Sequence, residues 1–199
     1  MSSVVISGDT SGTVTLTVPA TAGSNTITLP AVTGTAVVAG QNSSITANTF
    51  ITATTQTSIE FTALPSWVKR ITLMVNGLST NSSGNILIQL GTGSTSYTTS
   101  GYLGSCSYMS SGVATTAFTT GFGIVNATGS TAFVVQGSVV LTNLTGNIWV
   151  ASGVFGESDI ARTLTTGGGV TLGAALTAVR LYIDGTQQFD AGSINILYE

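Results

Sequence analysis

The first forty residues carry a repeated pattern in which threonine alternates with an aliphatic residue. Residues 15–23 line up with residues 26–34 at an offset of 11, and Gly12, Gly23 and Gly34 keep the same phase. Alternation with a period of two is typical of a half-buried strand, and the proline that closes each unit ends it. The pattern predicts a short N-terminal β segment over residues 1–40. Its aliphatic row consists of Val14, Leu16, Val18, Ile27 and Leu29.

This aliphatic row needs a partner, because two or three short strands bury little apolar surface alone. Copies of the same segment around a symmetry axis would supply one. We therefore expect the row to serve trimerisation or attachment to a larger particle. Residues 41–48 are polar and indicate a joint between this segment and the rest of the chain.

The remainder of the chain alternates apolar and polar residues between turn signals, and no window shows a helical period with caps. Residues 172–179 are ambiguous, but their threonine and valine content favours a strand. Separators include the glycine run 167–169 and the Asp184-Gly185 pair, which predicts a short hairpin. Eight or nine strands at this spacing predict an all-β head domain over residues 49–199, a β-sandwich of the jelly-roll type. The expected strands are 49–62, 68–77, 85–90, 101–109, 117–125, 132–141, 147–155, 174–183 and 193–198.

The composition excludes several classes of function. Only 6% of residues are charged and histidine is absent, so neither a Ser-His-Asp triad nor an imidazole metal site is present. A net charge of −3 with four dispersed cations (Lys69, Arg70, Arg162, Arg180) argues against binding nucleic acid. No apolar stretch approaches the roughly 20 residues of a membrane span. We expect no cofactor, no metal and no membrane insertion.

The scarcity of charge also bears on assembly. Free sheet edges are usually protected by lysine, proline or bulges, and exposed low-charge strands tend to aggregate. Permanent burial of the edges in an oligomer avoids this outcome, while threonine on the outer faces keeps the surface wettable. This combination is typical of an extracellular or particle-borne structural protein.

Four segments resemble proteins of tailed bacteriophages. Residues 19–30 (PATAGSNTITLP) and 32–35 (VTGT) resemble a segment that recurs in tail-fibre proteins. Residues 64–72 (LPSWVKRIT) and 189–199 (FDAGSINILYE) resemble the terminal head region of many phage and prophage fibre proteins. The matches cover both ends of the chain and the start of the main domain.

The resemblance implies a homotrimer on the virion surface, assembled in the host cytoplasm, that contacts other virion proteins and a glycan or protein of the host envelope. The lack of histidine, the lone cysteine and the seven scattered carboxylates predict that the protein is not an enzyme. The chain lacks the extended shaft and the enzymatic insert of long fibres. A capsid decoration protein, bound to the phage head through its N-terminal segment, is therefore an alternative. A glycan-degrading, tailspike-like enzyme is a second alternative.

The enzymatic alternative depends on Glu157 and Asp159, because two residues apart on a strand they would share one face. Paired carboxylates can cleave glycosidic bonds. The competing interpretation, which we favour, is a solvated loop pair beside Arg162. Neither residue is assigned a catalytic role.

The aromatic and sulfur side chains have both structural and functional interpretations. The lone Cys106 is expected to be a small buried group, and Trp67 and Trp149 are expected in the core. Three tyrosines lie in a Ser/Gly-rich region whose composition suits adaptable recognition of a receptor, although packing within a strand is the interpretation that we favour. These tyrosines are Tyr97, Tyr102 and Tyr108.

Overall fold

The computed structural model describes residues 3–7, 13–17, 45–125, 134–159 and 161–199. The chain divides into two compact units, residues 1–36 and residues 37–199. In the first unit, strand β1 (Ser3–Ser7) pairs antiparallel with β2 (Thr13–Thr17). Of the predicted aliphatic row, Val14 and Leu16 lie on β2, opposite Ile6 and Val4. The other members of the row, Val18, Ile27 and Leu29, lie outside the described residues.

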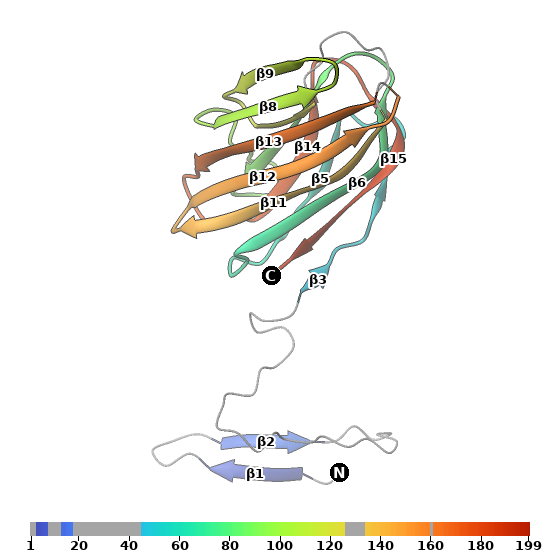
Figure 1. Cartoon of the computed structure of the whole chain (residues 1–199). Coiled ribbons are helices and arrows are strands. Elements are labelled where there is room, and N and C mark those ends of the chain that lie inside the picture. Colours follow the sequence, from blue (N-terminus) through green and yellow to red (C-terminus); the bar gives the residue numbers. More distant parts are fainter. Residues whose placement is uncertain (1–2, 8–12, 18–44, 126–133, 160) are drawn as a thin grey trace. The chain divides into compact units, whose positions relative to one another are not determined.

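The second unit is built from two antiparallel sheets, and its described residues contain no helix (Figure 1). The alternation of apolar and polar residues produces these strands, so the all-β prediction is confirmed. The strands are β3 (Thr46–Ala47), β4 (Ile51–Thr52), β5 (Ser58–Phe61), β6 (Arg70–Thr80), β7 (Asn85–Gly91), β8 (Leu103–Met109), β9 (Val113–Phe118), β10 (Phe122–Val125), β11 (Val135–Thr145), β12 (Ile148–Glu157), β13 (Arg162–Thr171), β14 (Ala178–Asp184) and β15 (Phe189–Tyr198).

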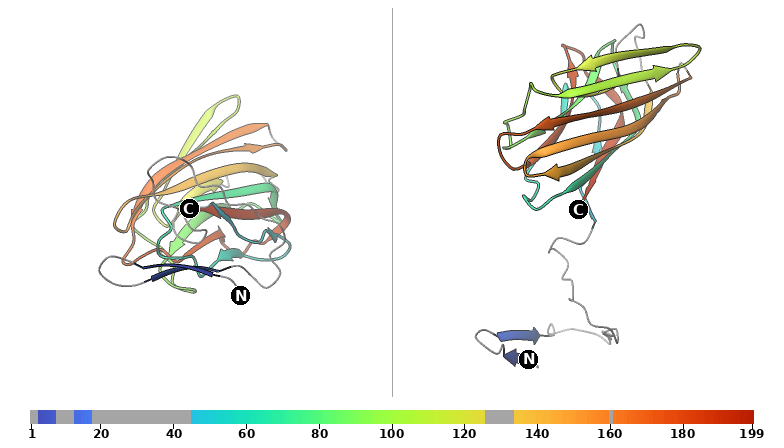
Figure 2. Two further views of the ribbon diagram at one scale, coloured as in Figure 1. Left: turned by 90° about the horizontal axis from the view of Figure 1, so that it is seen from below. Right: turned by 60° about the vertical axis from the view of Figure 1, so that its left-hand side comes forward.

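The smaller sheet has the strand order β10-β7-β14-β5. The larger sheet has the order β3-β15-β6-β11-β12-β13-β8-β9, with β4 also pairing with β15. Figure 2 shows the two sheets from two further directions. The strands from β5 to β8 alternate between the sheets, and the chain changes sheet again at β10, β11, β14 and β15. Each sheet is therefore made of segments far apart in the sequence.

The two sheets share one hydrophobic cluster. Ile88 and Leu181 of the smaller sheet and Leu73 and Trp149 of the larger one are among its buried members. Full burial of such a side chain contributes about 1.5–3 kcal/mol. The prediction of a buried Trp149 is confirmed, whereas Trp67 is only half-buried and packs against the edge of the cluster.

Two turn predictions and one strand prediction are corrected. The glycine run 167–169 is not a separator but the middle of β13, a strand that the sequence analysis missed. Asp184-Gly185 does not make a hairpin, because β14 and β15 belong to different sheets. The predicted strand 117–125 is two strands, β9 and β10, again in different sheets.

The glycine run fits within β13 because another glycine lies opposite it on β8. Gly168 pairs with Gly104 across β13 and β8, and a Cβ at Gly168 would lie 2.6 Å from the Cα of Gly104. Such a contact is far inside van der Waals distance, so the two strands approach only with glycine here. Glycine thus permits the pairing of β8 with β13.

Candidate functional site

The most distinctive surface of the described chain is the outer face of strands β8, β9, β11, β12 and β13. These strands lie side by side in front of β5 and β14 (Figure 1). On β12 and β13 the core-facing residues, such as Trp149 and Leu164, alternate with residues that face away from the core. Because side chains alternate along a strand, the outward set forms one continuous face.

We call this surface the neutral face, because none of its outward side chains is ionisable or aromatic. Five exposed aliphatic or thioether side chains project from it amid hydroxyl groups, and Leu103 and Val113 are the most exposed, at 80% and 72%. Ser107 and Thr115 form a hydrogen bond of 2.9 Å between their hydroxyl oxygens across β8 and β9. The neutral face comprises Leu103, Ser105, Ser107, Met109, Val113, Thr115, Ala117, Gln136, Ser138, Val140, Thr142, Val150, Ser152, Val154, Gly156, Thr163, Thr165, Gly167, Gly169 and Thr171.

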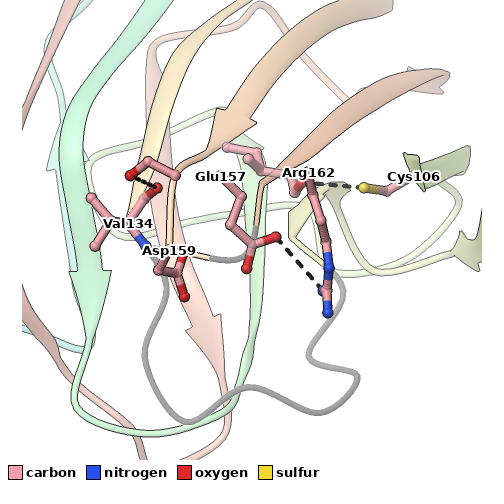
Figure 3. A network of polar contacts seen from close by, with 7 residues as sticks. Cys106, Val134, Glu157, Asp159 and Arg162 are labelled. Atoms are coloured by element: carbon pink, nitrogen blue, oxygen red, sulfur yellow. Dashed lines mark hydrogen bonds and ion pairs between the residues drawn. The ribbon is translucent and has the colours of Figure 1, made fainter. Parts of the chain in front are cut away.

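A charged pair lies beneath this face, at the end of the β12–β13 pair. Glu157 Oε2 lies 3.7 Å from Arg162 Nη1, and the Glu157 side chain is fully shielded from solvent. The Arg162 guanidinium lies over the ring of Tyr108, 4.6 Å from its centroid. Figure 3 shows Glu157 and Arg162 facing each other. Burial raises the pKa of Glu157, the Arg162 charge lowers it, and the Asp159 charge raises it further.

The structure corrects the expectation of a solvated pair for Glu157, which is buried, whereas Asp159 is exposed as expected. Glu157 faces inward from the last position of β12, and neither of its oxygens has a hydrogen-bond partner. Asp159 Oδ1 accepts a hydrogen bond of 3.2 Å from the backbone N–H of Val134. The predicted proximity to Arg162 is confirmed for Glu157. The two carboxylates therefore serve separate structural contacts.

The three candidate tyrosines lie in three different surroundings. Tyr102 is completely buried, and its hydroxyl accepts a hydrogen bond of 2.8 Å from the backbone N–H of Leu90. Tyr108 faces the core side of β8 beside Arg162. Tyr97 stacks on the Arg180 guanidinium, whose central carbon lies 4.3 Å from the ring centroid. The structure does not bring them together into one surface.

Arg180 organises a polar cluster on the smaller sheet that the sequence analysis did not identify. Its Nε and Nη2 donate to Gln89 Oε1 at 2.8 and 2.6 Å, and Gln89 Nε2 donates to the carbonyl of Thr120 at 2.6 Å. Arg180 Nη1 lies 3.8 Å from Glu60 Oε1. Arg180 and Gln89 are register partners on β14 and β7. Their contact could be predicted only with knowledge of that strand pairing.

The lone thiol is in the core, as predicted. Cys106 is buried, and its Sγ donates to the carbonyl of Ile124 at 3.1 Å. Burial raises the pKa of Cys106 to about 12. A thiol held in its protonated form has little nucleophilic character.

Within the described ranges, no three side chains of His, Cys, Asp or Glu cluster in a way that could hold a metal ion. No helix in the part of the chain that the structure covers is long and apolar enough to span a bilayer. Comparison of the chain with protein families, curated proteins and solved structures found no match.

Proposed function

We propose that the chain is a non-enzymatic structural protein of the bacteriophage virion surface, of the tail-fibre type, which works by assembly and by surface contact. The observation that carries this proposal is the neutral face, a five-stranded surface without an ionisable side chain. Rigid sheets covered with hydroxyl groups suit a protein whose task is to hold a shape. The resemblance of residues 64–72 and 189–199 to fibre head regions supplies the viral context.

The proposal includes a β-sandwich head and a homotrimer. Two antiparallel sheets that share one hydrophobic cluster support the sandwich, whose jelly-roll connectivity stays a prediction. The trimer would be held by the N-terminal segment, where Val14 and Leu16 lie on a two-stranded sheet too small to bury an aliphatic row alone.

The arrangement of carboxylates favours a structural role over glycan degradation. A glycosidase places two carboxyl groups on opposite sides of one scissile bond, with space between them for substrate. Glu157 is enclosed beside Arg162, and Asp159 is bound to the backbone of Val134. Each carboxylate therefore already serves a structural contact.

The position of the protein on the phage particle tests the proposal. Antibody labelling of purified virions should place the chain at the tail, and isolated protein should bind host cells and block phage adsorption. Labelling of the head in a regular lattice would instead favour capsid decoration through the N-terminal segment. Absence from purified particles, or release of sugars from host polysaccharide, would overturn the proposal.

A further inference from the structure

Strand β13 presents two glycines on the neutral face at positions where the fold does not require glycine. A Cβ at Gly167 would have the carbonyl oxygen of Ala151 as its nearest neighbour, at 3.8 Å, and one at Gly169 would lie 3.5 Å from the carbonyl oxygen of Trp149. Both distances are ordinary contacts, and neither glycine has a positive φ. Glycine inside a strand weakens it and often marks a close approach by another backbone or a ligand.

The side chains beside these glycines project from the sheet. Leu103 on β8 and Val150 on β12 are the register partners of Gly169, one on each side, and both are exposed. Protruding aliphatic groups therefore stand next to uncovered backbone on the same face. When two such faces meet, the aliphatic groups of one can cover the bare backbone of the other. The neutral face is thus complementary to a copy of itself.

We propose that the neutral face is a contact surface between copies of this chain, with Leu103 of one copy packed over the Gly167–Gly169 backbone of the next. This inference rests on the proposed function, because it identifies a second surface, besides the N-terminal segment, through which the proposed assembly is held together. The occupant is a second copy rather than a foreign partner. A charged partner would be matched by opposite charge, and protein partners and glycans are commonly held by aromatic or arginine side chains. The neutral face offers none of these.

The charge and the area of the neutral face both fit contact with a second copy of the chain. Identical surfaces bring identical charges together, and like charges in an interface are costly, so a face without charge avoids that cost. Five strands about 4.8 Å apart, with about seven residues each at 3.4 Å, span roughly 600 Å² in projection. This projected area is of the same order as the ~800 Å² per partner that a standard interface buries.

The test measures self-association of the full-length chain by sedimentation velocity over a range of concentrations. Gly167→Val should weaken association at least about tenfold, because the added side chain stands where the second copy approaches. Its thermal midpoint should stay unchanged or rise, since the position has room for a Cβ and valine favours strands. Leu103→Ser, at an already exposed position, should weaken association without touching the core.

The matched control is Gly173→Val, which adds the same group at a loop glycine with nothing within 4 Å of its Cβ and should associate like the wild type. A monomeric wild type, or normal association of both Gly167→Val and Leu103→Ser, would overturn the inference. If the two variants associate normally but fail to enter phage particles, the face binds another virion protein and the second copy is excluded. The presence of wild-type chain in purified virions decides the proposed function separately.

Discussion

The hydroxyl of Tyr102 accepts a hydrogen bond from the backbone N–H of Leu90 at 2.8 Å, beyond the point where β10 stops pairing with β7. Tyr102 immediately precedes β8 of the larger sheet, whereas Leu90 belongs to β7 of the smaller one. Its ring meets Phe122 edge-on, with centroids 4.9 Å apart. One side chain thereby joins the two sheets by a buried polar contact, and burial raises the pKa of Tyr102 to about 12.

Tyr102→Phe should lower the free energy of unfolding by about 1–3 kcal/mol, because the buried N–H of Leu90 loses its acceptor. Urea denaturation followed by tryptophan fluorescence measures the change. Tyr198→Phe removes the same atom from a half-buried ring at the end of β15 and should cost less. Equal losses in the two variants would show that the Leu90 contact contributes nothing specific.

Arg180→Lys should destabilise the chain by about 2 kcal/mol. Lysine cannot donate the paired hydrogen bonds to Gln89, and it has no planar guanidinium to stack on Tyr97. Arg70→Lys is the control, because Arg70 pairs with Glu199 at the surface with its side chain 52% exposed. Exposed ion pairs contribute roughly 0–1 kcal/mol. Thermal unfolding of both variants should separate them clearly, and similar midpoints would contradict this prediction.

Two neighbouring glycines of β13 should respond oppositely to the same substitution. Gly168→Ala should destabilise the fold by more than about 2 kcal/mol, because its Cβ would press against the Gly104 backbone. Gly167→Ala should be neutral or stabilising by about 0.5 kcal/mol, because it adds a Cβ with room around it and restricts the unfolded chain. Chemical denaturation of the two variants at a concentration where the wild type is monomeric, or with self-association explicitly fitted, tests the pair.

The buried carboxyl of Glu157 should make stability depend on pH. Its pKa is raised in the folded state, mainly by burial, so folding favours the protonated form. The free energy of unfolding should therefore decrease as pH rises from the ordinary carboxyl range to the raised pKa in the folded state. Glu157→Gln should flatten this dependence, whereas Asp184→Asn at an exposed strand end provides the baseline for losing one carboxylate. A steeper fall of the free energy of unfolding with pH in Glu157→Gln would contradict the prediction that folding favours the protonated form of Glu157.

Cys106 should resist thiol reagents in the native protein and react fully in denaturant. Its thiol is buried and donates a hydrogen bond to the carbonyl of Ile124. The thiol is protonated at neutral pH, because burial raises its pKa to about 12. Ser105→Cys, at the adjacent and outward position of the same strand, should react readily in native protein at a concentration where the chain is monomeric. Rapid native labelling of Cys106 in the wild type would mean that β8 opens far more often than its packing implies.

The alternation of apolar and polar residues was sufficient to predict most strands of the second unit, because the inward row of each must be apolar. It could not identify strand partners. Asp184-Gly185 has the composition of a hairpin turn, yet the same residues also suit a connection between sheets. The glycines 167–169 resemble a turn until Gly104 is known to lie opposite Gly168.

The candidate sites show the same limit. The period of two places Glu157 on the inward row of β12, but its charge led to the expectation of a solvated loop. Arg180 and Gln89 lie 91 positions apart in the chain, so no local pattern connects them. The neutral face is likewise a property of neighbouring strands rather than of any one segment.

The placement of β15 has a consequence for synthesis of the chain. This strand, from residues 189–198, lies between β6 and the short strands β3 and β4, so an early part of the larger sheet pairs with a late one. While the polypeptide is still emerging from the ribosome, β6 has one side unpaired and its N–H and C=O groups open to other nascent chains. The larger sheet therefore stays incomplete until β15 has been synthesised, and neighbouring chains on one polysome are exposed to mispairing until then.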